Sequence, residues 1–303
     1  MNAVRRFFDS DIAFSFRRSP VAMIAAGLVV LTLLAAAFAH WIAPHDPFDL
    51  ASLSLLDSFK PPAWFADGEW SYPLGTDDQG RDVLSGILYG TRISLIVGIS
   101  AVALAMGIGI SVGLASGYVG GAMDATLMRI ADIQLTFPAI LIALLVDGVA
   151  RVALPRDLRE AMEIYVLIFA IGISNWPQFA RTVRGSTLVE RGKDYVLAAQ
   201  IIGIRSPKIL FSHILPNVIG PVLVIATLNL GFAILSEATL SFLGLGLPPT
   251  QPSLGTLIRI GNAFLFSGEW WVTLFPGAAL VIMVLSINLL GDWLRDALNP
   301  RLR

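Results

Sequence analysis

The chain contains six long stretches of mostly apolar residues, separated by segments that hold most of its charged, proline and glycine residues. The six runs are residues 21–42, 93–117, 124–146, 164–180, 218–242 and 270–291. A helix needs roughly 20 apolar residues to cross the hydrocarbon core of a bilayer. The runs therefore predict an all-α integral membrane protein with six transmembrane helices.

The composition supports this class and narrows the chemistry. Of the 303 residues, 55% are hydrophobic and 14% are charged, and the mean hydropathy is +0.73; a soluble domain of this length cannot bury so much apolar surface. The net charge of −1 excludes a generally basic nucleic-acid binder. Cysteine is absent, so there is no disulfide, thiolate metal site or catalytic thiol. The run 21–42 is too long for a signal peptide, which favours a retained helix.

Lysine and arginine residues gather before the first helix, after the fourth and after the sixth. They are Arg5, Arg6, Arg17 and Arg18; Arg181, Arg184, Arg191, Lys193, Arg205 and Lys208; and Arg295, Arg301 and Arg303. With six crossings all three regions fall on one side of the membrane, and the positive-inside rule makes that side the cytoplasm. The predicted parts are a cytoplasmic tail (1–20), the first helix (21–42), a periplasmic segment (43–90), a five-helix core (91–292) with a cytoplasmic loop (181–217), and a cytoplasmic tail (293–303).

Within that loop, residues 194–217 form a charged, helix-forming island with the sequence DYVLAAQIIGIRSPKILFSHILPN. Ala198, Ala199 and Gly203 keep one helix face flat enough for the backbone of another protein to approach. Gly203 is expected to end this helix, so that a second can begin near Ser206. The pattern indicates either a docking surface or a plain surface helix–turn–helix.

The same island resembles the cytoplasmic EAA loop of bacterial ABC importer permeases, whose coupling helix fits a groove on a separate ATPase subunit. The resemblance implies that the ATPase-coupling residues are Tyr195, Ala198, Ala199, Gly203, Ile204, His213, Leu215 and Pro216. Leu197 stands at the position of the family's glutamate. A contact made by that glutamate is therefore not carried over to this chain, whereas the argument from shape stands.

Two more strings extend the resemblance over about residues 75–303. LGTDDQGRD at 74–82 looks like the entry to the permease core in the oligopeptide, dipeptide and nickel branch, in subunits of the C type, and NLLGDWLRDALNPR at 288–301 matches the tail. Taken alone, the first string is a capped turn, in which Gly75 and Gly80 allow the turn and Asp82 can cap a helix. The resemblance implies a type I, MetI-like permease core with one extra N-terminal helix.

Several polar residues lie inside the predicted helices, where an ionisable side chain is costly. Arg129 and Asp132 are three residues apart on one helix face, which predicts a buried structural ion pair. Glu237 is expected near the outer end of its helix, where it can help to gate the pathway or cap a re-entrant turn. Ser241 and Asn229 are further candidates for the pathway.

Three glycines in the second predicted helix, Gly109, Gly113 and Gly117, repeat at four-residue spacing. In lipid, such a stripe lets two helices pack backbone to backbone. Packing within the chain is the commoner case, and contact with a partner permease is the alternative.

The motifs that are missing define the role of the chain. It has no Gly-x-x-x-x-Gly-Lys-Ser/Thr phosphate loop and no extramembrane region long enough for a nucleotide-binding fold. We expect a transporter subunit, not an enzyme, without catalytic residues, cofactor or metal of its own. The resemblance implies a bacterial inner-membrane complex with a second permease, one or two ABC ATPases that bind ATP and Mg, a periplasmic solute-binding protein and a peptide-like substrate.

Other functions stay open at this point. Related permeases import nickel or another small solute. A proton-coupled secondary transporter would use Asp132 and Glu237, although six helices without an evident repeat are few for a free-standing carrier. A membrane-embedded enzyme is disfavoured because His40, His45 and His213 form no metal-spaced cluster. Few polar residues lie at mid-membrane depth, so substrate specificity is expected to reside mostly in the binding protein.

Overall fold

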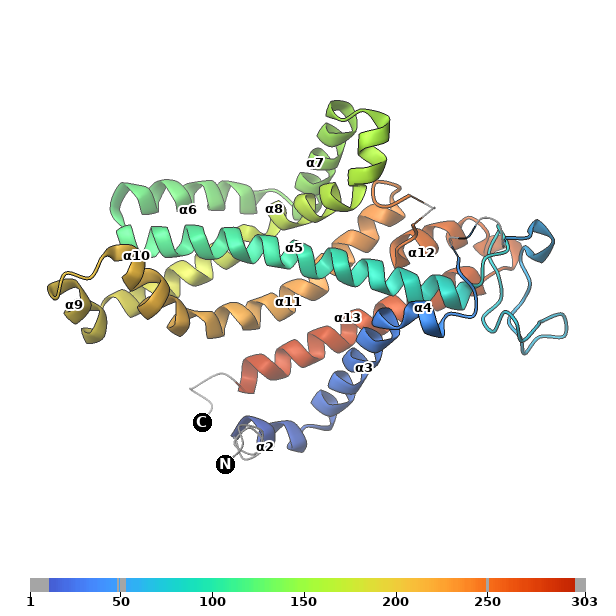
Figure 1. The fold of residues 1–303 in the computed structure, drawn as a ribbon, viewed down its shortest axis with the longest axis horizontal. Helices are drawn as coiled ribbons and strands as arrows, with labels where there is room; N and C mark the ends of the chain where they lie inside the picture. Colours follow the sequence, from blue (N-terminus) through green and yellow to red (C-terminus); the bar gives the residue numbers. More distant parts are fainter. Residues whose placement is uncertain (1–10, 48, 50–52, 249–250, 298–303) are drawn as a thin grey trace.

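The computed structural model describes residues 11–47, 49, 53–248 and 251–297. Four of the arginines that bear on the orientation, Arg5, Arg6, Arg301 and Arg303, lie outside the described residues. The described part is an elongated bundle of α-helices (Figure 1).

The first half of the bundle contains α2 (Asp11–Arg18), α3 (Pro20–Ala37), α4 (Ala39–Ile42), α5 (Val83–Val119), α6 (Gly121–Thr136), α7 (Ala139–Ala153) and α8 (Arg156–Arg191). The second half contains α9 (Asp194–Ile201), α10 (Ser206–Ile209), α11 (Leu215–Phe242), α12 (Leu254–Asn262) and α13 (Trp271–Ala297). Three short turns complete it: η1 (Leu55–Asp57), the π-helical η2 (Leu210–Ile214) and η3 (Leu265–Ser267).

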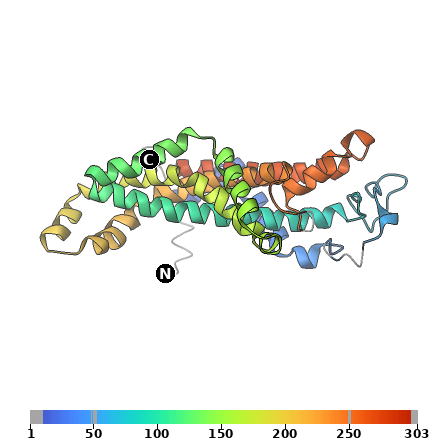
Figure 2. The same ribbon diagram turned by 90° about the horizontal axis from the view of Figure 1, so that it is seen from above.

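The centre of the bundle is built from α5, α8 and α11. α5 packs along α8 more extensively than any other described pair, and α11 packs against both helices. α13 lies against α11 and carries α3 on its flank (Figures 1 and 2). α9 and α10 lie at one end of the bundle, and α12 lies with the segment before α5 at the other. α2 contacts the last turns of α13, where the rings of Phe16 and Trp293 meet edge to face with centroids 5.1 Å apart.

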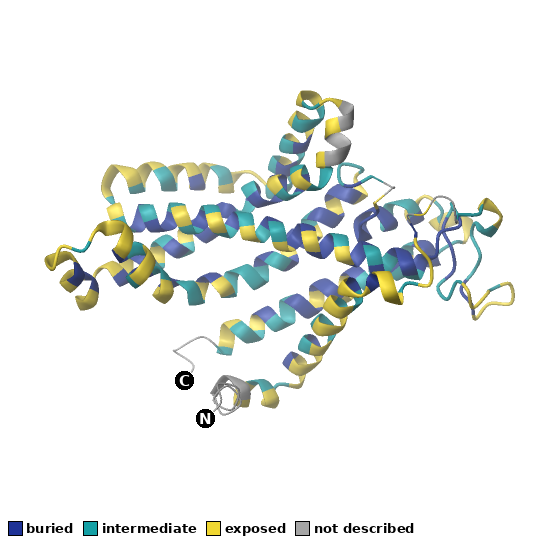
Figure 3. Cartoon of the chain, in the orientation of Figure 1, coloured by how far each residue is buried: buried dark blue, intermediate teal, exposed yellow. Residues whose placement is uncertain are grey.

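Burial follows the helix contacts (Figure 3). The largest buried cluster includes Phe179 and Val183 of α8, Ile209 of α10 and Val218 of α11, all of them fully buried. Many large apolar side chains on the outer faces, such as Ile99, are exposed. A water-soluble monomer rarely exposes so much apolar surface, whereas helices that lie in lipid do so as a rule.

The number of membrane crossings is four or five by length and composition of the described helices. Four are long and apolar enough: α3, α5, the α10–α11 unit (206–242) and α13. The pair α6 and α7 makes a fifth if it is counted as one broken span. The predicted run 164–180 lies inside α8, which is not among these candidates. The all-helical membrane class is confirmed, and the count of six is not.

The predicted single helix at 124–146 is wrong, because two helices meet there at an angle of 93°. α6 ends before Phe137, whose backbone is extended (φ −90°, ψ 135°). Pro138 explains the break, since proline has no N–H for the helix and forces the residue before it out of the α conformation. α7 then starts at Ala139 and leaves the bundle sideways (Figure 1).

Other helix ends also differ from the predicted runs. α5 begins at Val83 and not at 93, so the segment before it ends earlier than the predicted residue 90. The cause is Asp82, whose carboxylate accepts a hydrogen bond from the backbone N–H of Ser85 at 2.8 Å and caps the helix. The first predicted run is divided at Phe38 into α3 and the short α4.

Candidate functional site

The α9 end of the bundle contains the predicted helix break. Gly203 has a left-handed backbone (φ +81°), and its N–H donates to the Gln200 carbonyl at 3.0 Å, while the Ile204 N–H donates to the Ala199 carbonyl at 3.0 Å. This is the pattern of a helix that stops at a C-terminal glycine. α10 starts at Ser206. The predicted break at Gly203 and the second helix near Ser206 are confirmed.

Tyr195 of α9 is the centre of a hydrogen-bond network that joins three helices. Its hydroxyl donates to Glu190 Oε2 at 2.7 Å, at the end of α8. Asn217 in the first turn of α11 donates from Nδ2 to the Tyr195 oxygen at 3.2 Å and to the His213 carbonyl at 2.7 Å. Partial burial, together with the Glu190 carboxylate, raises the pKa of Tyr195 to about 12. Tyr195 therefore connects α9 by hydrogen bonds to both α8 and α11.

The opposite face of α9 is apolar and uncovered. Val196 and Ala199 are buried against the bundle, whereas Ile201 is 86% exposed and Ile202 78% exposed. We call the exposed apolar residues at this end, Leu197, Ile201, Ile202 and Phe211, the exposed α9 surface. Ala198 is also exposed and, with its single methyl group, keeps this face low. Exposed apolar patches of this kind mark interaction sites.

The predicted residues after α10 lie where the chain turns into α11. His213 belongs to the π-helical turn η2, and its Nδ1 lies 3.4 Å from the Lys208 carbonyl oxygen. Leu215 packs on the central cluster, and Pro216 occupies the first turn of α11, where a missing N–H costs nothing. π-Helical turns are rare and are often found at functional sites.

The glycine stripe of α5 is the contact with α8. A Cβ added at Gly113 would lie 2.6 Å from Val183 Cβ and 2.6 Å from the Ala180 carbonyl oxygen. A Cβ at Gly109 would overlap Phe179, and one at Gly117 would lie 2.8 Å from Thr187 Cβ. The prediction of packing within the chain is confirmed.

The structure also shows an ion pair that the sequence did not reveal, at the end of the bundle where α5 leads into α6. Arg184 of α8 donates from Nε and Nη2 to the two carboxylate oxygens of Asp124 at 2.5 and 2.7 Å. Ser116 of α5 also donates to Asp124. One carboxylate thus joins α5, α6 and α8. A bidentate arginine–carboxylate pair is the strongest form of this contact, but sequence spacing carried no sign of it, because the partners are 60 residues apart.

The predicted ion pair between Arg129 and Asp132 is wrong. Asp132 faces α8, where Arg181 Nη2 lies 3.7 Å from its Oδ1. The Asp132 side chain is 53% exposed, and Arg129 is also exposed, so neither charge is buried within the chain. The reason is that Ala131, fully buried, is the residue of α6 that packs inward, which turns its neighbours to the edge of the contact.

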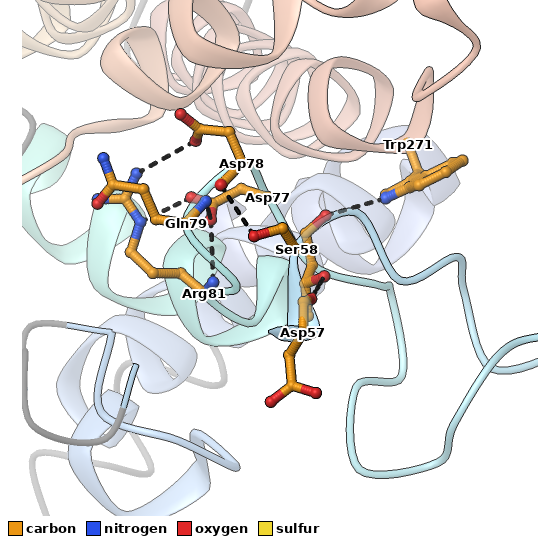
Figure 4. Close-up of polar contacts among 8 residues, drawn as sticks. Asp57, Ser58, Asp77, Asp78, Gln79, Arg81 and Trp271 are labelled. Carbon is orange, nitrogen blue, oxygen red and sulfur yellow. Dashed lines mark hydrogen bonds and ion pairs between the residues drawn. The ribbon is translucent and has the colours of Figure 1, made fainter. Parts of the chain in front are cut away.

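The string at 74–82 folds into a buried turn before α5 (Figure 4). Asp77 accepts hydrogen bonds from the backbone N–H groups of Gln79 and Arg81 at 2.9 Å each, and from Arg81 Nε at 2.6 Å. Thr76 pairs with Asp82 as an antiparallel bridge. All its polar side chains except Asp78 and Gln79 are at least nine-tenths buried. The prediction that this string forms a turn is confirmed.

Figure 4 also shows how the turn is fixed to the rest of the protein. The Trp271 indole N–H, at the start of α13, donates to the Thr76 carbonyl at 3.2 Å. Gly75 (φ +83°) is required there, because a Cβ would lie 2.6 Å from the Lys60 carbonyl oxygen and 2.9 Å from the Trp271 nitrogen. The turn therefore holds the first residues of α5 against those of α13.

Glu237 is fully buried near the end of α11 that is distant from α9. Ser94 of α5 donates to its Oε2, and Ser241 donates to its Oε1, each at 2.7 Å. The structure thus brings together two predicted residues, Glu237 and Ser241, and adds Ser94, which the sequence did not single out. A carboxylate held in this way joins α5 to α11.

Asn229 does not belong to this group. It lies two turns earlier on α11 and is 4% exposed. Its Nδ2 donates to the Ile225 carbonyl at 3.0 Å, and its Oδ1 is buried without a hydrogen-bond partner. Within the single chain it therefore faces the interior.

Among the described residues, no group of three or more His, Asp or Glu side chains could hold a metal ion. The described features are an exposed apolar surface at one end, a buried carboxylate toward the other and long helices between them. These features define an all-helical membrane protein.

The chain belongs to the family of binding-protein-dependent transport system inner membrane components, whose model matches residues 107–303. Residues 4–62 match the N-terminal transmembrane domain of oligopeptide transport permease C. The first match covers the bundle from residue 107, within α5, onward, and the second covers the extra N-terminal helix. Members of this family are permease subunits without catalytic activity or cofactors of their own.

Curated relatives are similar over almost the whole chain. The dipeptide transport system permease protein DppC of Haemophilus influenzae is 38% identical over 96% of this chain and 94% of its own. The oligopeptide transport system permease protein OppC of Bacillus subtilis is 38% identical over 97% of this chain and 90% of its own. DppC of Escherichia coli K12 is 39% identical over 95% and 91%.

The fold is also found among solved structures. A chain of the MetNI methionine ABC transporter, in an inward-facing conformation, matches with a TM-score of 0.52 and 18% identity over 68% of this chain and 93% of its own. A second crystal form gives a TM-score of 0.51. The MetI-like fold is thereby confirmed.

Proposed function

We propose that this chain is the C-type permease of an ATP-driven importer for dipeptides or oligopeptides. The family and the relatives named for peptide transport support this substrate class. In this proposal a second permease completes the pathway, one or two ATPases supply the energy, and a periplasmic binding protein delivers the peptide. The chain crosses the membrane six times, α8 being one of the crossings, with both termini in the cytoplasm and residues 43–82 outside.

The exposed α9 surface is the observation that supports the proposed mechanism. Ile201 and Ile202 are held on a short helix whose other face is buried, and Tyr195 links that helix to α8 and α11. An ATPase that binds this surface can move α9 when it closes on ATP, and the network passes the movement to α11. Glu237 then moves with α11 relative to Ser94 of α5, so it acts as a gate residue at the far end.

The absence of cysteine makes a crosslinking test direct. A cysteine at Ile201 should form a disulfide with a cysteine in the groove of the ATPase, and crosslinking should fall when ATP binding is blocked. Phe266 is the matched control, because it is 99% exposed but lies on η3 at the other end of the bundle. No crosslink across a cysteine scan of 198–205 would exclude the docking proposal.

Transport itself is tested with both permeases and the ATPases in liposomes. Ligand-stimulated ATP hydrolysis and peptide uptake should both require the binding protein, because the chain offers few polar groups to read a particular cargo. Uptake of nickel in place of peptide would change the substrate class. Uptake that follows an imposed proton gradient without ATP would replace the proposal by a secondary transporter.

A further inference from the structure

Two arginine side chains lie close to Gly244, in the connection from α11 to α12. α11 ends with the Leu245 N–H donating to the Leu240 carbonyl at 2.9 Å and the Gly244 N–H donating to the Ser241 carbonyl at 3.1 Å. Gly244 has a left-handed backbone (φ +80°). The Leu243 N–H donates to the Thr239 carbonyl at 3.0 Å, so these carbonyls in the last turn already have donors.

The first cation is Arg151 of α7, and its charge is balanced. Its Nε lies 2.6 Å from Asp147 Oδ2, one turn earlier on the same helix. Its Nη2 donates to the Gly244 carbonyl at 3.5 Å. Arg151 therefore joins α7 to the α11–α12 connection and has no charge left to offer a ligand.

The second cation is Arg259, in the last turn of α12. Leu254, Leu257 and Gly261 of the same helix are buried. A Cβ added to Gly244 would lie 3.1 Å from Arg259 Nη1, so the guanidinium group occupies the space that this glycine leaves. Arg259 Nε is buried without a hydrogen-bond partner, and no carboxylate among the described residues lies within ion-pair distance of the side chain.

A partly buried guanidinium group without a counter-ion is unfavourable and implies a partner that binds in another state. Capping of the Thr239, Leu240 and Ser241 carbonyls does not explain it, because each of them already accepts a backbone N–H. Glu237 does not serve either, since both of its oxygens accept hydrogen bonds from Ser94 and Ser241. In membrane transport proteins, ionisable residues near the bundle interior mark substrate pathways.

We propose that Arg259 binds a carboxylate group of the transported peptide as it enters the pathway. The planar guanidinium group presents paired N–H donors that match a carboxylate, and it stays charged at every relevant pH. The α12 end is the outer end in the proposed topology, so the contact is made as the peptide leaves the binding protein. This inference rests on the proposed peptide import. It gives Arg259 a role in recognising the carboxylate that all such peptides share, whereas the choice among peptides stays with the binding protein.

The first test measures chemical protection of Arg259 in the assembled complex in phosphatidylcholine liposomes. An arginine-selective reagent, phenylglyoxal, is applied with or without dialanine, and mass spectrometry quantifies the modification of each arginine. Dialanine should reduce modification of Arg259 severalfold, and alanyl-alaninamide, which lacks the carboxylate, should not. Arg205, exposed beside α10, is the control whose modification should stay constant.

Four results would overturn the proposal. Equal protection by both compounds would exclude recognition of the carboxylate, and no protection would exclude the site. If Arg259 reacts in the isolated chain but is already unreactive in the complex without peptide, its partner is a carboxylate of the second permease. If anionic phospholipid alone protects it, its partner is a lipid phosphate.

The second test compares Arg259→Gln and Arg259→Lys for uptake of dialanine per ATP hydrolysed. The glutamine variant should lose about 10-fold or more, as expected when a hydrogen-bonded charge is removed from an ionic contact, and the lysine variant should lose less. Basal ATP hydrolysis and the thermal midpoint report on folding and should be unchanged. Unaltered dialanine uptake in Arg259→Gln would refute the role. If the wild-type complex takes up no peptide while dialanine still protects Arg259, the proposed function fails and the site stands.

Discussion

Replacement of Tyr195 by phenylalanine tests whether the hydrogen bonds of the Tyr195 hydroxyl hold α9 against α8 and α11. The change removes one oxygen atom and keeps the ring. Glu190 loses a hydrogen bond of 2.7 Å, and Asn217 loses an acceptor at 3.2 Å. α9 has only eight residues, and a helix of that length is not stable without tertiary contacts. Its docked position therefore depends on contacts of this kind.

The size of the effect follows from the geometry. A hydrogen bond to a charged group is worth about 1.5–3 kcal/mol. Tyr195 is 37% exposed, so water replaces part of the lost contact, and we expect about 1–2 kcal/mol. That loss lowers the ratio of docked to undocked α9 by about 5- to 30-fold.

Hydrogen–deuterium exchange of the α9 amides measures this ratio directly, because these amides exchange through local opening. Exchange in α9 should accelerate by the same factor in Tyr195→Phe, whereas exchange in α5 should not change. In liposomes, peptide uptake per ATP hydrolysed should fall. Tyr165→Phe is the matched control, since Tyr165 is 66% exposed on α8 and its side chain makes no hydrogen bond within the described part of the chain. Unchanged α9 exchange in Tyr195→Phe would refute the reasoning.

The remaining predictions address packing, pH, the turn before α5 and the exposed acid on α6. Gly113→Leu should destabilise the α5–α8 contact by more than the roughly 1–3 kcal/mol of a typical overpacked core, visible as a lower thermal midpoint; a normal midpoint would exclude close packing there. Tyr195 should stay protonated until the pH approaches its raised pKa of about 12. Because this pKa lies above the ordinary value near 10, the contribution of Tyr195 to stability is complete below pH 10 and is lost as the pH rises through 12. Ultraviolet titration of the phenol can follow this change. Trp271→Phe removes the hydrogen bond to the Thr76 carbonyl and should cost about 1 kcal/mol, with faster exchange confined to the turn; faster exchange throughout α5 and α13 would contradict this. Asp132→Asn should leave the pH dependence of uptake unchanged, because its carboxylate is exposed and paired with arginine on α8; a shifted pH profile would favour a proton relay.

The class of protein could be predicted from local patterns, because lipid tolerates only long apolar helices and the chain has several. The break at Gly203 was also predictable, since only glycine adopts the left-handed conformation there at little cost. The same holds for the turn at 74–82 and for the glycine stripe of α5. Each of these features depends on residues within one or two helical turns of one another.

Contacts between distant segments were decided only by the tertiary structure. Asp124 and Arg184 meet because α5, α6 and α8 pack together, and nothing in the spacing of these residues indicates it. Asp132 was assigned to Arg129 by sequence distance, yet it turns to α8, because packing of α6 and not spacing along it sets the direction of a side chain. Pro138 was present in the sequence, but the 93° bend depends on what α6 and α7 pack against.

Arg259 shows the same division. In the sequence it is one cation at the end of a short amphipathic segment. Only the fold places it against Gly244, near an arginine that already has its carboxylate, and leaves it without a carboxylate partner among the residues that the structure describes. Sequence alone determined that the chain is an all-helical membrane protein with a helix break at Gly203, because backbone solvation and glycine geometry act locally. The tertiary structure decided which charges are paired, since burial and distance between helices are properties of the whole bundle.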